Sequence, residues 1–151
     1  MDFQYYLEDI PSSIDNLKLL RYVDFSGTSI TRLPETVCNL QNLQTLKVNN
    51  CQDLIILPKK LEKLFELRYL ENDYCYRLDS MPDGMDRLSL LHTLNTFIVN
   101  EGGTNLNELR HLNHQEGNLC IQNLHRSRNV VLENGILNKK NSLVSLKLVF
   151  R

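Results

Sequence analysis

Apolar residues recur along this chain in two alternating patterns, one of period two and one of period three. In "LQTLKV", residues 43–48, apolar Leu46 and Val48 alternate with polar neighbours, as they do in a half-buried β-strand. In "VCNLQNL", residues 37–43, every third residue is apolar, which favours one buried face of a short helix or 3₁₀ segment. The pattern therefore predicts short strands joined by short helical segments.

The two patterns repeat together at a nearly constant interval. The prolines are 23, 24 and 24 residues apart, and we expect each to occupy the first position of a helical turn, because proline fixes φ and lacks a backbone donor. The central apolar residues of the strands are 23, 24, 24, 25 and 27 residues apart. A unit of this length with leucines at these offsets is similar to the leucine-rich repeat. The prolines are Pro11, Pro34, Pro58 and Pro82, and the central strand residues are Val23, Leu46, Leu70, Leu94, Leu119 and Leu146.

This repeat predicts an α/β solenoid of about six coils. Parallel strands form the concave face and short helical or irregular segments form the convex face. Residues 1–151 form a single domain, with clear repeats over 10–99 and degenerate repeats over 100–151. One coil cannot bury its leucines alone, so neighbouring coils must cover one another. Asn72, at an inward strand position, breaks the apolar pattern.

The cysteines fit the same repeat. Cys51 and Cys75 hold the position that Thr28 takes one coil earlier, where we expect a side chain that hydrogen-bonds to the backbone as the chain leaves the strand. A disulfide is the alternative, because neighbouring strands lie about 4.8 Å apart. Reduced thiols fit a cytosolic chain better.

Composition and charge narrow the class of partner. The net charge of −1 and the lack of a basic run argue against nucleic acid as a partner. No apolar run approaches the ~20 residues of a membrane span, and no signal peptide or Asn-x-Ser/Thr sequon is visible. We therefore expect a cytoplasmic protein.

Two groups of side chains invite a chemical interpretation. Glu108, His111 and His114 have helical spacing and could bind a metal, but a tight site needs further ligands, so a solvated polar face is the preferred interpretation. Asp83 and Asp86 lie where a helical turn begins, and we expect them to cap its free donors. No nucleophile lies beside a base, so we expect no catalytic residue, cofactor or metal.

The outward strand positions remain as the candidate site, because repeat proteins commonly bind partners on the concave face. Tyrosines there, including Tyr74 just beyond a strand, could be binding hot spots or could simply cover aliphatic neighbours. The predicted partner-binding residues are Tyr22, Asp24, Thr45, Lys47, Asn49, Tyr69, Glu71, Asp73, Thr93 and Asn95.

The motifs of this sequence, and their order along the chain, also resemble those of a known family. "LRYVDFSGTSITRLPETVCNLQNLQTLKVNNCQDLIILP" is similar to "LRYLDLSGTxIxxLPxSIxxLxNLQTLxLxxCxxLxxLP", a phrase of plant intracellular disease-resistance proteins of the coiled-coil, nucleotide-binding, leucine-rich-repeat class. The match includes Leu20 to Phe25, Ser26 to Thr28, Leu33-Pro34, Cys51 and Leu57-Pro58. Later motifs of the same family region resemble two further segments of this chain, "MPDGMDRLSLLHTLNTFIVNEGG" and "NELRHLN…GNLCIQNL". The segment "HRSRNVVLENGILNKK" matches the family pattern only loosely.

The resemblance implies a function in innate immunity. In that family the repeats recognise a pathogen effector or a guarded host protein, and they restrain the nucleotide-binding domain of the same receptor. Because this chain has no P-loop, we expect it to be a fragment of a larger receptor or a truncated product. The alternatives are an intracellular scaffold of the Ras-group leucine-rich-repeat kind and a substrate-recruiting subunit of a ubiquitin ligase. An enzyme is the least favoured class.

Overall fold

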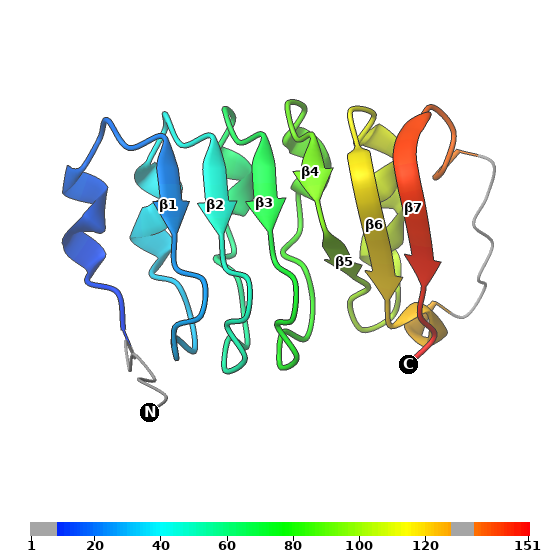
Figure 1. Ribbon diagram of the computed structural model, residues 1–151, viewed down its shortest axis with the longest axis horizontal. Helices are drawn as coiled ribbons and strands as arrows, with labels where there is room; N and C mark the ends of the chain where they lie inside the picture. The colour runs from blue at the N-terminus through cyan, green and yellow to red at the C-terminus, as the bar shows by residue number, and fades with distance from the viewer. Residues whose placement is uncertain (1–8, 128–134) are drawn as a thin grey trace.

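The computed structural model of the protein describes residues 9–127 and 135–151, which form a stack of coils (Figure 1). Residues 1–8 and 128–134 of the predicted domain lie outside the described residues. The helices within these two ranges are all of the 3₁₀ type: η1 (Ser12–Asn16), η2 (Glu35–Asn39), η3 (Leu61–Lys63), η4 (Met85–Arg87), η5 (Thr104–His111) and η6 (Leu124–Arg126). The strands are β1 (Tyr22–Asp24), β2 (Thr45–Lys47), β3 (Tyr69–Glu71), β4 (Thr93–Leu94), β5 (Thr96–Ile98), β6 (Glu116–Gln122) and β7 (Ser142–Leu148).

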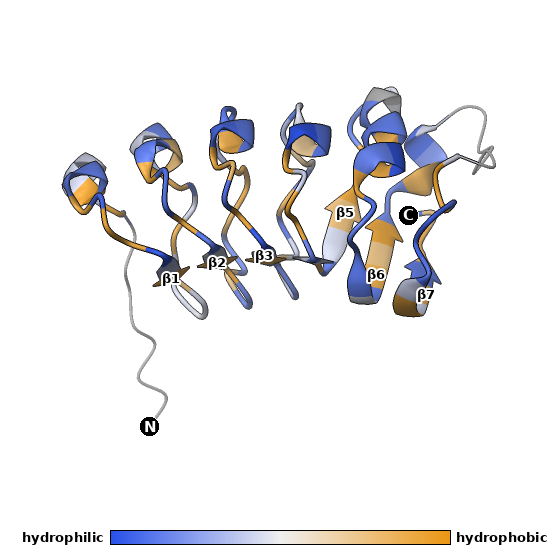
Figure 2. Ribbon diagram, turned by 90° about the horizontal axis from the view of Figure 1, so that it is seen from above, coloured by the Kyte–Doolittle hydropathy of each residue, from blue (hydrophilic) through white to orange (hydrophobic). Residues whose placement is uncertain are grey.

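The strands are parallel and form two sheets, ordered β1-β2-β3-β4 and β5-β6-β7. They line one side of the stack, called here the strand-bearing face, and the helices line the other (Figure 2). The predicted solenoid of about six coils is confirmed, since β4 and β5 belong to one coil. The division of that coil's strand at Asn95 was not predicted.

This division changes the register of the later coils. Leu119 lies opposite Leu146, as predicted. Leu94 does not lie opposite Leu119, because β5 and β6 pair Phe97 with Ile121. Leu94 and Phe97 are both fully buried although they are three residues apart, so this coil contains one residue more than the period-two pattern allows.

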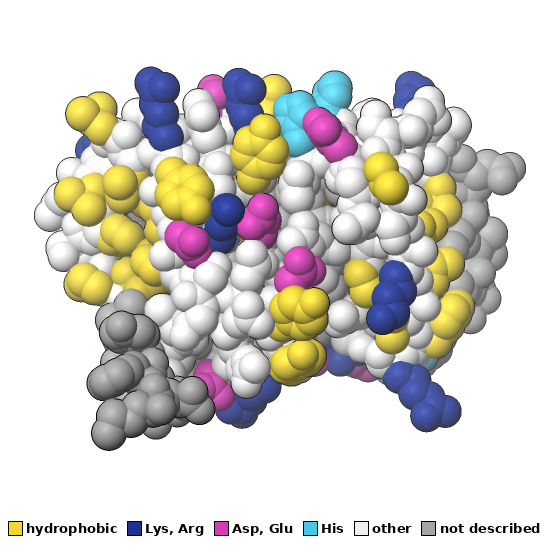
Figure 3. Space-filling view, in the orientation of Figure 1, with side chains coloured by type: hydrophobic (Ala, Val, Ile, Leu, Met, Phe, Trp, Pro, Cys, Tyr) yellow, Lys and Arg dark blue, Asp and Glu magenta, His cyan; other side chains and the backbone are white. Residues whose placement is uncertain are grey.

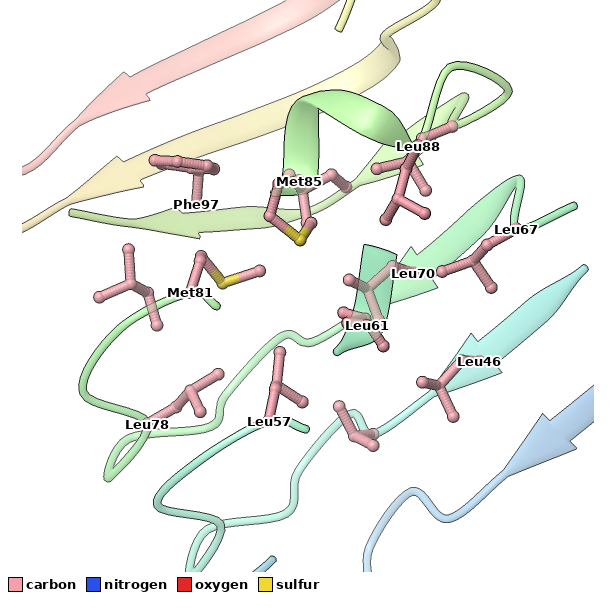
Figure 4. Close-up of a cluster of buried hydrophobic side chains, with 14 of the residues drawn as sticks. Leu46, Leu57, Leu61, Leu67, Leu70, Leu78, Met81, Met85, Leu88 and Phe97 are labelled. Carbon is pink, nitrogen blue, oxygen red and sulfur yellow. The ribbon is translucent and has the colours of Figure 1, made fainter. Parts of the chain in front are cut away.

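The core lies between the strands and the helices, where leucines of successive coils interleave (Figure 4). Burying one such side chain contributes roughly 1.5–3 kcal/mol. The first described coil is less covered, with 56% of Leu17 exposed. The apolar residues that follow the second, third and fourth prolines at three-residue spacing are all buried, as predicted: Val37, Leu40, Leu43, Leu61, Leu64, Leu67, Met85, Leu88 and Leu91.

The prolines precede the helices rather than beginning them. Pro34 caps η2 with φ −64° and ψ 144°, and its carbonyl accepts a hydrogen bond from the amide of Val37 (3.0 Å). Pro11 does the same for η1, with ψ 141°. The predicted first helical position is therefore wrong. Proline fixes only φ, so ψ stays free to be extended, and the carbonyl can start the helix from the capping residue.

The turns that follow β1, β2 and β3 are held as predicted. The hydroxyl of Thr28 donates to the carbonyl of Phe25 (2.7 Å). The thiol of Cys51 donates to the same carbonyl from the next coil (3.1 Å), and the thiol of Cys75 donates to the carbonyl of Val48 (3.0 Å). All four cysteines are free thiols.

Asn72 is buried at the inward position where an apolar residue was expected. Its amide nitrogen donates to the carbonyl of Thr96 (2.8 Å), and its side-chain oxygen accepts from the amide of Thr96 (3.0 Å). The carboxamide thus satisfies the backbone where the fourth strand divides. Asn72 joins the two sheets instead of weakening the coil.

Candidate protein-binding face

The strand-bearing face carries all ten predicted side chains, each exposed or half-buried. The strand register aligns them in rows across the coils, so residues from four coils meet on one surface. The first row consists of Tyr22, Thr45, Tyr69 and Thr93, and the second row consists of Asp24, Lys47 and Glu71. The remaining residues lie at the strand ends: Asn49, Asp73 and Asn95. That these residues bind a partner stays a prediction.

A connected network of polar side chains crosses this face. The ammonium of Lys47 lies 3.4 Å from the Glu71 carboxylate, which also accepts a hydrogen bond from the side-chain amide of Asn49 (3.1 Å). The other end of the Asn49 carboxamide accepts from the amide of Asp73 (2.9 Å). The carboxylate of Asp73 then accepts from Asn95 (2.7 Å). Each side chain is therefore held in place by a neighbouring coil.

The charges of the second row are stabilised by their neighbours. The nitrogen of Lys47 lies 5.4 Å from the centre of the Tyr22 ring, within cation–π range. The Tyr22 hydroxyl, followed by the Glu71 carboxylate, raises the pKa of Lys47. Hydrogen bonds from Ser26, led by its side chain, lower the pKa of Asp24. The row therefore presents fixed charges of both signs at neutral pH.

An aromatic edge borders the network, and the sequence analysis did not identify it. The rings of Tyr69 and His92 have centroids 6.2 Å apart, and His92 stacks on His114 at 5.8 Å. Glu116 lies 4.0 Å from the Nε2 atom of His92. The histidines form a cluster at one edge of the face in Figure 3. They come from coils of irregular length, so sequence spacing gave no signal of their proximity.

A cavity of about 690 Å³ opens on this face beside the junction between the two sheets. Asp73 and Asn95, both predicted site residues, lie in its wall, together with Tyr74, Glu116 and Lys147. Its size lies within the range of ordinary ligand pockets. The cavity lies beside the break between β4 and β5, which the regular repeat pattern did not predict.

The possible metal site of Glu108, His111 and His114 does not form in the structure. The two oxygens of Glu108 accept hydrogen bonds from the amides of Gly84 (2.9 Å) and Met85 (3.0 Å) in the preceding coil. Burial raises the pKa of Glu108. His114 instead stacks on His92, so the sequence triplet does not converge. In residues 9–127 and 135–151, no cluster of three or more potential ligands could hold a metal.

The expected capping by Asp83 and Asp86 is wrong. No side-chain cap bond is made at the start of η4 by its own coil, whose N-cap is Gly84 with φ 86°. Glu108 takes this role from one coil away, because the left-handed glycine turns the free amides toward the next coil.

Comparison with known proteins agrees with the fold. The family model of the leucine-rich repeat region matches residues 6–144. This chain belongs to the leucine-rich repeat family. Solved leucine-rich repeat proteins share its fold at 23% identity: LIC12759 of Leptospira interrogans (TM-score 0.61, over 93% of this chain and 36% of that one) and the Arabidopsis receptor kinase HAESA (TM-score 0.58, over 76% and 20%).

The curated relatives of this leucine-rich repeat chain are plant disease-resistance proteins. Protein At3g14460 of Arabidopsis thaliana, assigned to disease resistance, is 44% identical over 120 residues, or 80% of this chain. TMV resistance protein N of Nicotiana glutinosa is 34% identical over 91 residues, or 58% of this chain. The chain spans only 8% of the length of either relative. None of the helices formed by residues 9–127 and 135–151 has the length and apolar character needed to cross a bilayer.

Proposed function

We propose that this chain is a protein-recognition module of a plant innate immune receptor that acts in the cytoplasm. It binds a pathogen effector or a guarded host protein through the strand-bearing face. In the whole receptor it also restrains a nucleotide-binding switch domain. The network from Lys47 through Glu71 and Asn49 to Asp73 carries this proposal, because it preorganises polar side chains for a protein partner. The disease-resistance names of the relatives support the immune setting.

A two-hybrid screen tests the proposal. Libraries of proteins secreted by plant pathogens and of plant host proteins are screened against the 151-residue chain. Partners that bind the chain should be lost when Tyr69 and Glu71 are both replaced by alanine. Circular dichroism should show an unchanged fold for this variant, because Tyr69 is exposed and Glu71 is half-buried.

The matched control replaces Lys59 and Lys63, exposed residues on the helical side, by alanine. These two changes should leave every interaction intact. If they weaken binding more than the changes at Tyr69 and Glu71 do, the assignment of the binding face is wrong.

A further inference from the structure

The residue that follows each of the first three strands by three positions has a left-handed backbone. Gly27 has φ 75°, Asn50 has φ 58° and Tyr74 has φ 59°. Glycine adopts this conformation without strain and asparagine does so readily, but a bulky aromatic residue rarely does. Tyr74 is therefore an unfavourable residue at a position where the two preceding coils carry favourable ones.

The side chain of Tyr74 gains little in the fold that would offset this strain. It is 61% exposed, and its ring lies 6.3 Å from that of Tyr76, which is 73% exposed. Two large aromatic rings thus lie side by side in solvent. Strained residues that persist without a packing benefit are typical of binding sites.

These two rings line the cavity at the junction of the sheets. Asp73 and Glu116 add carboxylates to its wall, and Lys147 adds an ammonium. The carboxylate of Asp73 accepts a hydrogen bond from the neutral side-chain amide of Asn95, and 58% of the side chain of Glu116 is exposed. The wall therefore combines aromatic faces with an excess of negative charge.

We propose that Tyr74, Tyr76 and Asp73 form an anchoring site for an arginine side chain on an extended segment of the protein partner. A guanidinium stacks on tyrosine rings and pairs with carboxylates, whereas an acidic segment would meet two carboxylates and one ammonium. This inference rests on the proposed function and adds the chemistry of the partner to it.

The first experiment measures what Tyr74 costs the fold. Tyr74→Asn, which installs the residue found at position 50, should raise the Tm by about 2 °C. Asn50→Tyr is the matched control, and it should lower the Tm without creating a binding site, because position 50 does not line the cavity. If Tyr74→Asn lowers the Tm, tyrosine serves the fold and the proposal is overturned.

The second experiment identifies the ligand chemistry. A displayed library of random dodecapeptides is selected on the 151-residue chain, and clones that still bind Tyr74→Asn are removed. The remaining clones should be rich in arginine. Synthetic peptides of their sequence should bind at least 10-fold more weakly to Tyr74→Asn, and should lose similar affinity when citrulline replaces arginine. Acidic clones, or none that depend on Tyr74, would overturn the proposal.

The double alanine variant at Tyr69 and Glu71 separates the two proposals. Partners that depend on Tyr69 and Glu71 but not on Tyr74 would leave the proposed function standing and refute the arginine site. Partners that depend on neither set would refute both.

Discussion

The coils of the first sheet and those of the second are held together in different ways. In the first sheet, side chains bond across coils to residues 22–27 positions away, as Asn49 does to Glu71 and Cys75 does to Val48. In the second region, Arg126 reaches Asp79, which is 47 positions away, and Lys140 reaches Leu109, which is 31 positions away. Where repeats are regular, the neighbouring coil supplies the partner. Where the repeats are irregular, long cationic side chains extend further along the stack and donate hydrogen bonds to backbone carbonyls.

The largest difference between the two regions should appear in the core. Leu46→Ala should lower the free energy of unfolding by ~2–5 kcal/mol, because Leu46 is fully buried in the middle of the first sheet. Leu146→Ala in β7 should cost far less, since 40% of Leu146 is exposed. Urea unfolding measures both. Thr45→Ala should cost within about half a kcal/mol, and equal losses at positions 45 and 46 would contradict the strand register.

The junction between the sheets should depend on Asn72. Asn72→Ala should lower the free energy of unfolding by ~2–3 kcal/mol, because the amide and the carbonyl of Thr96 both lose a buried partner. Asn72→Leu restores the apolar repeat pattern but should also destabilise the chain. Faster hydrogen exchange at the Thr96 amide would locate the damage. A stabilised Asn72→Leu would mean that apolar packing outweighs these bonds.

Alkaline pH should change the contributions of two buried groups, one in each region, in opposite directions. Burial raises the pKa of Cys75, in the first region, to about 11, so ionisation of unfolded thiols removes stability as the pH rises from ~8.5 to about 11. Burial lowers the pKa of Lys140, in the second region, to about 8. Unfolded lysine keeps its proton up to ~10.4, so this group adds stability between about 8 and 10.4.

Two variants isolate these contributions, each on the order of 2 kcal/mol. Relative to wild type, Cys75→Ser should lessen the loss of unfolding free energy above pH 9, and Lys140→Gln should deepen it. Denaturant unfolding from pH 7 to 11 measures both. Differences of the opposite sign would show that the titration of these groups does not control the alkaline response.

The smallest expected effect comes from comparing one arginine in each region. Arg126→Ala should lower the free energy of unfolding by about 1 kcal/mol, because its guanidinium donates to the carbonyls of Asp79 and Val99. Arg77→Ala should change little, since its ion pair with Asp53 joins two exposed side chains. Equal urea midpoints for the two variants would contradict the expected difference between the contributions of Arg126 and Arg77 to stability.

The sequence was sufficient for the first region because its information is local and repeated. Period-two alternation identified Leu46 as inward and Lys47 as outward, and a constant interval aligned them with the next coil. The interval also placed Cys51 and Cys75 in the turn, where both donate to carbonyls of the coil before.

The second region could not be read in the same way. One additional residue between Leu94 and Phe97 changes which residues face inward, and no local sequence pattern predicts this residue. Interactions such as that of Arg126 with Asp79 join segments with no common repeat position. The candidate site divides accordingly: its polar rows were predicted, whereas the cavity and the stack of His92 on His114 were not.

The polar network of the strand-bearing face also has an evolutionary consequence. Because Asn49 holds both the Glu71 side chain and the Asp73 backbone, a substitution at position 49 changes how the next coil presents two of its residues. Single substitutions in the rows would therefore alter several parts of the surface at once. We expect new recognition specificities to arise by paired changes in adjacent coils, or by exchange of whole coils, more readily than by isolated replacements.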